Sequence, residues 1–128
     1  MQSIKKSTFP AKTISTYQYW AQIAKVVDGD TIDLVIDVGF NTTVSNRFRL
    51  VGIDTPEMFG VRHDSDEYRR GIKAKEEFEG LLPQSGWLEV RVFKSANREK
   101  YGRYLCELFS EGKSINAELI RLGYGDTQ

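Results

Sequence analysis

The stretch of sequence that decides the fold is DGDTIDLVID, residues 28–37. Its opening Asp-Gly pair predicts a tight turn, at which glycine takes a positive φ. Ile32, Leu34 and Ile36 then recur at every second position, which is typical of a strand with one buried face. Residues 17–27, YQYWAQIAKVV, are rich in aromatic and β-branched residues and predict the strand before the turn. Together the two segments predict a β-hairpin.

The segments that follow predict three more strands and two helices. Residues 43–53, TVSNRFRLVGI, predict a third strand with Val44, Phe48 and Leu50 on one face. A helix is expected over residues 68–82, ended by Gly80 and Pro83, and strands are expected at 88–92 and 103–109. A closing helix is expected to begin at its cap, Ser114, and to stop at Gly123. Its inward residues would be Ile115, Leu119 and Leu122.

The order of these elements predicts the fold class. A sheet of five short strands exposes both edges unless it curls into a barrel. The order therefore indicates a mainly β fold with helices, a five-stranded Greek-key β-barrel of the OB-fold type. One helix lies between strands 3 and 4, and a short helix closes the chain. We expect residues 17–128 to form this single domain, with residues 1–16 as a flexible N-terminal segment.

Composition narrows the class of protein. The 128 residues fit one domain, and one cysteine with one histidine argues against a disulfide framework or a Cys/His zinc site. Because 18 Lys and Arg balance 18 Asp and Glu, the chain does not coat nucleic acid or membrane through bulk charge. The balance is uneven, since residues 26–57 hold six acids (Asp28, Asp30, Asp33, Asp37, Asp54 and Glu57) against two bases (Arg47 and Arg49).

The sequence carries no sign of a membrane partner. No stretch approaches the roughly 20 apolar residues that span a bilayer, and the lysine-bearing start lacks the apolar segment of an intact signal peptide. We therefore expect a chain that is cytoplasmic as written, or secreted if a leader has been removed. A monomer is the default expectation.

Two carboxylates at the ends of neighbouring predicted strands indicate a metal site. Asp30 follows the first turn and Asp54 follows the third strand, so a barrel can bring both to one cation. Ca²⁺ prefers oxygen ligands and accepts backbone carbonyls, which Thr55 would supply. Pro56 stiffens the turn that presents this carbonyl. The sequence therefore predicts a calcium site.

The residues around this site suit phosphodiester hydrolysis. Glu57 stands two residues beyond Thr55, where it would orient or deprotonate a metal-bound water. Arg49 and Arg103 offer planar guanidinium groups that bind phosphate oxygens in pairs and keep their charge. The predicted chemistry is cleavage of a phosphodiester by these three side chains.

The ordered motifs DGDT, FRLVGIDTPE and KYGR, followed by SINAELIRLGYG, resemble the staphylococcal nuclease (thermonuclease) family over roughly residues 18–125. The resemblance implies an OB-fold barrel and calcium-dependent nuclease activity on DNA and RNA. It implies the same calcium ligands and the same catalytic trio as the residues themselves suggest. It also implies that Lys100 and Tyr101 contact a terminal phosphate of the substrate, and that Asp28 is a second acid near the metal.

Two other functions compete with this interpretation. One is a catalytically inactive domain of the same fold that binds nucleic acid or a protein; such domains lack one or more of the catalytic trio, which this chain keeps. The other is a metal-free OB-fold binder of oligonucleotides or sugars, which leaves Asp30, Asp54 and Glu57 without a role. The preference between DNA and RNA stays open.

Several further residues have plainer interpretations. We expect His63 on the surface, and Cys106 as a buried structural thiol. Trp20 and Trp87 are expected in the barrel rather than in a base-stacking platform. A basic set on and before the predicted helix forms either a phosphate-facing patch or an ordinary solvated helix face: Arg62, Arg69, Arg70, Lys73 and Lys75.

Overall fold

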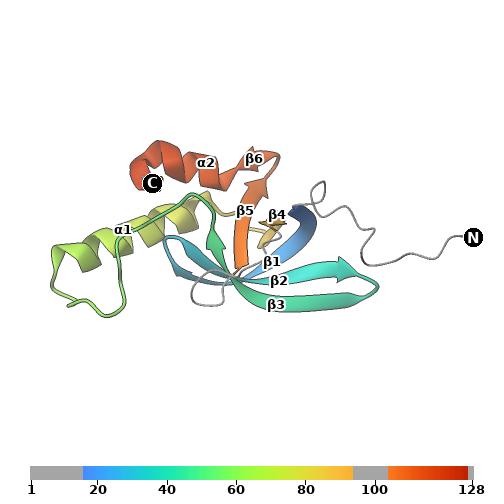
Figure 1. Ribbon diagram of the computed structural model, residues 1–128, viewed down its shortest axis with the longest axis horizontal. Helices are drawn as coiled ribbons and strands as arrows, with labels where there is room; N and C mark the ends of the chain where they lie inside the picture. The colour runs from blue at the N-terminus through green and yellow to red at the C-terminus, as the bar shows by residue number, and fades with distance from the viewer. Residues whose placement is uncertain (1–15, 94–103, 127–128) are drawn as a thin grey trace, which may run out of the picture.

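The computed structural model describes residues 16–93 and 104–126. Within them a β-barrel carries helices on one side (Figure 1). The strands are β1 (Thr16–Asp28), β2 (Thr31–Gly39), β3 (Thr42–Leu50), β4 (Trp87–Phe93), β5 (Tyr104–Ser110) and the short β6 (Lys113–Ser114). The helices are α1 (Asp66–Leu81) and α2 (Ile115–Leu119), which η2 (Ile120–Tyr124) continues. In this part of the chain no helix combines the length and the apolar character needed to cross a membrane.

The barrel closes through pairing between distant strands. The sheet order is β3-β2-β1-β4-β5, and β3 also pairs with β5, so five strands form a ring. The closing contact is parallel and runs from Phe48 opposite Tyr104 to Leu50 opposite Cys106, whereas the other pairs are antiparallel. With α1 between β3 and β4, the predicted OB-fold barrel is confirmed. The predicted boundary at residue 16 is not tested, because residues 1–15 lie outside the described ranges.

The core lies inside the ring and under the helices. Phe78 of α1 and Leu119 of α2 are fully buried against the strand residues. Cys106 is also buried, and burial, with a smaller effect of Glu107, raises the pKa of its thiol, as expected for a structural cysteine. The buried strand residues are Ala21, Ile32, Leu34, Ile36, Phe48, Leu50, Leu88, Val90 and Leu108.

Trp20 and Trp87 lie in barrel strands, as predicted, but their side chains face solvent, as does that of Val44, which was predicted on the same face as Phe48 and Leu50. Trp20 is 57% exposed because its neighbour Ala21 occupies the inward position of β1, and Trp87 is 48% exposed beside the inward Leu88. Val44 is 40% exposed. Among the described residues, the first half of β3 pairs only with β2, and the described pairing of β3 with β5 starts at Phe48.

The helix ends also differ in part from expectation. The side chain of Ser65 accepts a hydrogen bond from the Tyr68 N–H at 3.1 Å, so α1 begins at Asp66 rather than at residue 68. Gly80 lies inside α1 and does not end it. Ser114 caps α2 as predicted, by accepting from the Ala117 N–H at 3.1 Å. Gly123 leaves the helix with φ 104°, but the Leu122 side chain is exposed rather than inward.

Candidate functional site

The turn between β1 and β2 presents a buried carboxylate. Asp30 is 9% exposed. Its Oδ1 accepts a hydrogen bond from Thr31 Oγ1 at 2.9 Å, and its backbone N–H donates to Asp28 Oδ1 at 3.1 Å. Its Oδ2 accepts from the backbone N–H of Thr55 at 3.3 Å. The structure thus brings Asp30 beside the loop that carries Asp54 and Thr55.

The environment of Asp30 disfavours its negative charge. The pKa of Asp30 is raised from 3.8 to about 6, chiefly by burial and also by the neighbouring Asp28, while hydrogen bonds from Thr31 and Thr55 oppose the shift. A nearby cation stabilises the ionised form of a carboxylate that is buried next to a second carboxylate. The turn therefore has the charge and the oxygen donors that suit a hard cation.

Arg49 lies at the end of β3, where it holds the following loop. Its Nη2 donates to the carbonyl oxygen of Ile53 at 3.0 Å and lies 3.8 Å from Asp54 Oδ1. The side chain of Arg49 is 25% exposed and that of Asp54 is 69% exposed. The loop therefore presents a guanidinium and a carboxylate together at the surface.

The end of the described chain fastens the same loop from the other side. The Asp54 N–H donates to the carbonyl oxygen of Tyr124 at 2.9 Å, and the Asp126 N–H donates to that of Gly52 at 2.7 Å. Ile53 forms an isolated bridge with Gly125. The loop after β3 thus contacts the segment after α2 (Figure 1). Residues 124–126 were not among the predicted site residues, and these backbone contacts carry no sequence signal.

Gly29 has a different role from the predicted one. It lacks the positive φ expected of a turn glycine. A Cβ on Gly29 would lie 2.8 Å from Thr55 Cγ2 and 2.9 Å from the Cβ of Ala74. The turn therefore requires glycine because it packs directly against the Thr55 loop and α1. Sequence reasoning missed this contact, because an Asp-Gly pair indicates a turn but not what lies against it.

Of the remaining predicted catalytic and substrate-binding residues, the structure describes only Glu57. Glu57 is exposed, and it has no hydrogen-bond partner in the part of the chain that the structure describes. Arg103, Lys100 and Tyr101 lie outside the described residues, so their roles stay predictions. Within residues 16–93 and 104–126, no three His, Cys, Asp or Glu side chains converge to hold a metal ion. A cation here would depend on Asp30, Asp54 and the Thr55 carbonyl.

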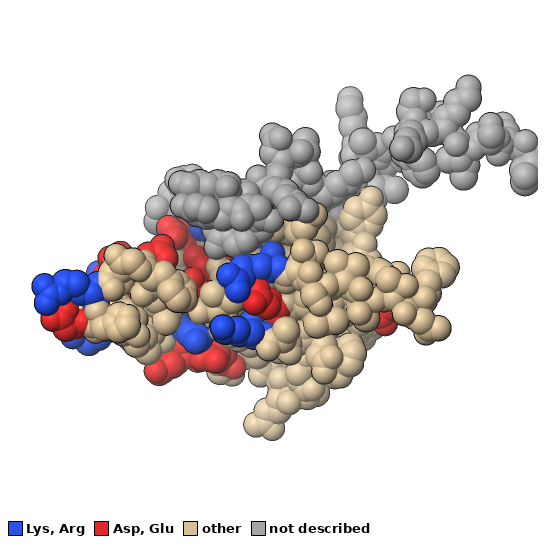
Figure 2. Space-filling model, turned by 90° about the horizontal axis from the view of Figure 1, so that it is seen from below, with Lys and Arg blue, Asp and Glu red and all other residues tan. Residues whose placement is uncertain are grey.

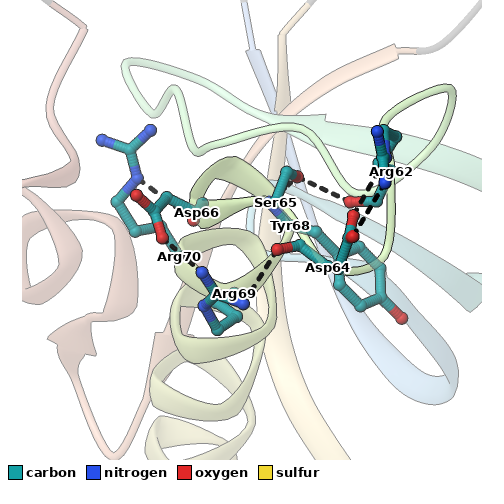
Figure 3. Close-up of polar contacts among 7 residues, drawn as sticks. All are labelled: Arg62, Asp64, Ser65, Asp66, Tyr68, Arg69 and Arg70. Carbon is teal, nitrogen blue, oxygen red and sulfur yellow. Dashed lines mark hydrogen bonds and ion pairs between the residues drawn. The ribbon is translucent and has the colours of Figure 1, made fainter.

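Two of the five basic side chains on and before α1, Arg62 and Arg69, are paired with acids (Figure 3). Arg62 donates to both oxygens of Asp64, at 3.0 and 2.9 Å. Arg69 pairs with Asp66 and donates to the Asp64 carbonyl oxygen at 2.9 Å. Blue and red atoms are interspersed on the face seen in Figure 2. For Arg62 and Arg69, these contacts favour a solvated surface over a phosphate-facing patch.

His63 lies on the surface, as predicted. Its ring stacks on Tyr68 with 4.3 Å between the ring centroids. The imidazole therefore packs on the loop before α1, and none of its contacts links it to Asp30 or Asp54.

Comparisons with known proteins identify the family of the chain. The family model described as staphylococcal nuclease homologue matches residues 47–128. The chain is 34% identical to Endonuclease YhcR of Bacillus subtilis (strain 168) over 122 residues, covering 92% of this chain and 10% of that protein. It is 32% identical to Endonuclease YncB of the same organism over 99 residues, covering 77% of this chain and 43% of that protein.

An archaeal protein is similar as well. The chain is 29% identical to Uncharacterized protein MJ1439 of Methanocaldococcus jannaschii over 124 residues, covering 83% of this chain and 58% of that protein. The chain thus spans between 10% and 58% of the length of these three relatives.

Proposed function

The chain belongs to the staphylococcal nuclease homologue family, and on that premise we propose that it is a calcium-dependent nuclease that hydrolyses phosphodiester bonds of DNA and RNA. Two of its relatives carry the name endonuclease. The observation that carries the proposal is the hydrogen bond from the Thr55 N–H to Asp30 Oδ2. It joins the two acidic motifs, distant in sequence, that a cation would bridge.

The donors at this point suit Ca²⁺. Asp30 and Asp54 supply carboxylate oxygens, and Thr55 supplies a carbonyl oxygen, all of which are hard ligands. Asp28 adds negative charge beside Asp30, as its effect on the pKa of Asp30 indicates. When bound, Ca²⁺ would polarise a phosphoryl oxygen and offset the negative charge that grows in the transition state.

Glu57 is the proposed base or orienting group for the attacking water. It lies two residues beyond Thr55, and its exposed carboxylate, which has no partner among residues 16–93 and 104–126, would accept a hydrogen bond from that water. The water oxygen would form a bond to phosphorus while its proton passes to Glu57, and the bond from phosphorus to the departing oxygen would break.

Two arginines are proposed to stabilise the phosphate. Arg49 donates one N–H to Ile53, which orients the guanidinium and leaves further N–H groups for phosphate oxygens. Arg103 would bind the same phosphate from another side, with Lys100 and Tyr101 contacting a terminal phosphate. Donors held in place in this way are each worth roughly 3–4 kcal/mol at the barrier.

The direct test is a cleavage assay on single-stranded DNA, double-stranded DNA and RNA, with calcium and with a chelator. We expect calcium-dependent cleavage that Glu57→Gln removes. Binding of these nucleic acids without cleavage would instead identify a non-catalytic binding domain. Cleavage that persists in chelator would show that the proposed calcium requirement is wrong.

A further inference from the structure

A buried glycine in α1 makes an unusually close contact with the loop that carries Glu57. A Cβ on Gly71 would lie 2.7 Å from Met58 Cγ, 2.9 Å from the Pro56 carbonyl oxygen and 3.2 Å from the Glu57 carbonyl oxygen. The first two distances are shorter than packed atoms tolerate. Any side chain at residue 71 would therefore push the loop away from the helix.

Helix formation does not explain glycine at this position. Glycine is among the least favourable residues in a helix interior because it loses the most backbone entropy on folding. Gly71 also lacks a positive φ, so its backbone conformation suits other residues. Close packing against the loop is thus the one reason for glycine that the geometry supplies.

We propose that Gly71 is a positioning residue for Glu57, an inference that rests on the proposed nuclease function. By allowing the backbone of residues 56 and 57 to lie directly on α1, Gly71 sets the distance from the Glu57 carboxylate to the metal-binding residues. Gly71 itself does not touch the substrate. Its effect passes through the loop backbone.

Hydrogen bonds hold the residues that precede Pro56 in this loop, so the displacement by a side chain at residue 71 is confined to Pro56 and Glu57. The Thr55 N–H is bound to Asp30, and the Asp54 N–H is bound to the Tyr124 carbonyl. A methyl group at residue 71 therefore presses on a segment whose preceding residues are fixed. The displacement falls on Pro56 and Glu57, while Asp54 and Thr55 keep their partners.

The test compares Gly71→Ala with Gly80→Ala, a matched control in the same helix. A Cβ on Gly80 meets nothing within 4 Å, so Gly80→Ala should raise the melting temperature by a few degrees and leave activity unchanged. Gly71→Ala should lower kcat at least about tenfold with little change in KM, because misplacement of a reacting group by about 1 Å costs up to about 100-fold.

A double-mutant cycle with Glu57 separates a positioning role of Gly71 from a general loss of structure. If Gly71 acts through Glu57, Gly71→Ala should lower kcat little further in a Glu57→Gln background. An equal loss in both backgrounds would overturn the inference. The double variant Met58→Ala/Gly71→Ala removes the nearest contact and leaves the two contacts with backbone carbonyls. Full recovery of kcat in this double variant would also overturn the inference.

Backbone chemical shifts distinguish failure of this inference from failure of the proposed function. The amide resonances of Glu57 and Met58 should move in Gly71→Ala and stay in place in Gly80→Ala, whether or not the protein cleaves nucleic acid. If the wild type cleaves nothing, the proposed function is wrong, and unchanged Glu57 and Met58 resonances in Gly71→Ala overturn the positioning role separately. If the wild type cleaves and Gly71→Ala cleaves equally well, only the positioning role is wrong.

Discussion

The backbone N–H of Thr55 donates a hydrogen bond to Asp30 Oδ2 across 25 residues of sequence. Asp30 belongs to the turn between β1 and β2, and Thr55 belongs to the loop after β3. Gly29 makes the approach possible, because any side chain there would meet Thr55. The two acidic motifs of the site are therefore assembled by direct packing of one turn on one loop.

The first prediction concerns Glu57. Glu57→Gln should lower the rate of cleavage about 100- to 10,000-fold, because the amide cannot take a proton from the attacking water. Stability should be unchanged, since Glu57 is exposed. Steady-state kinetics on a DNA substrate checks the rate, and Glu79→Gln, an exposed change near the end of α1, is the control. Equal rates for wild type and Glu57→Gln would exclude Glu57 as the base.

Calcium should stabilise the folded protein through Asp30. At a concentration 100 times the dissociation constant, a ligand that binds only the native state adds about 2.7 kcal/mol. Asp30→Asn should remove this gain, which melting scans with calcium and with chelator measure. Asp33→Asn is the matched control, because Asp33 pairs with Arg47 on the barrel surface. A calcium shift that survives in Asp30→Asn would contradict the proposed site.

The metal-free protein should lose stability as Asp30 ionises. The pKa of Asp30 is about 6 in the folded protein against 3.8 for an ordinary carboxyl, so the folded state binds the proton more tightly than the unfolded state. The stability that the protonated Asp30 contributes is therefore present below pH 4 and is lost as the pH rises through 6. In chelator, Asp30→Asn should become more stable relative to wild type by about 2–3 kcal/mol between pH 4 and 7. Denaturant titrations check this, and a pH-independent difference would contradict it.

Asn116 should be among the residues on which stability depends most. This buried side chain accepts from the Leu108 N–H at 3.0 Å and donates to the carbonyl oxygens of Val51 and Cys106 at 3.0 and 3.2 Å. Asn116→Ala should cost about 2–4 kcal/mol of unfolding free energy, because three backbone groups lose a partner in contacts of which two are buried. Urea denaturation measures the loss. Gln84→Ala, in an exposed loop, should cost less than about 0.5 kcal/mol.

Local patterns predicted most of the secondary structure. The alternation of Ile32, Leu34 and Ile36 placed β2 and its buried face correctly, since a strand presents every second residue to the same side. Ser114 marked the start of α2 because its hydroxyl satisfies a free N–H of the first turn. The same patterns placed Trp20 and Trp87 in barrel strands correctly. They did not indicate that both side chains face solvent, because an aromatic residue indicates a strand but not which face is buried.

The sequence by itself determined the strands, the Ser114 cap and the residue types that the proposed chemistry needs, because these depend on neighbours a few positions apart. Only the tertiary structure decided which of those residues meet. The close contacts of Gly29 and Gly71 and the bond from Asp54 to Tyr124 join segments that are distant in sequence. Such contacts arise when the barrel closes and the helices pack against it, so the periodicity of side chains along the sequence does not predict them.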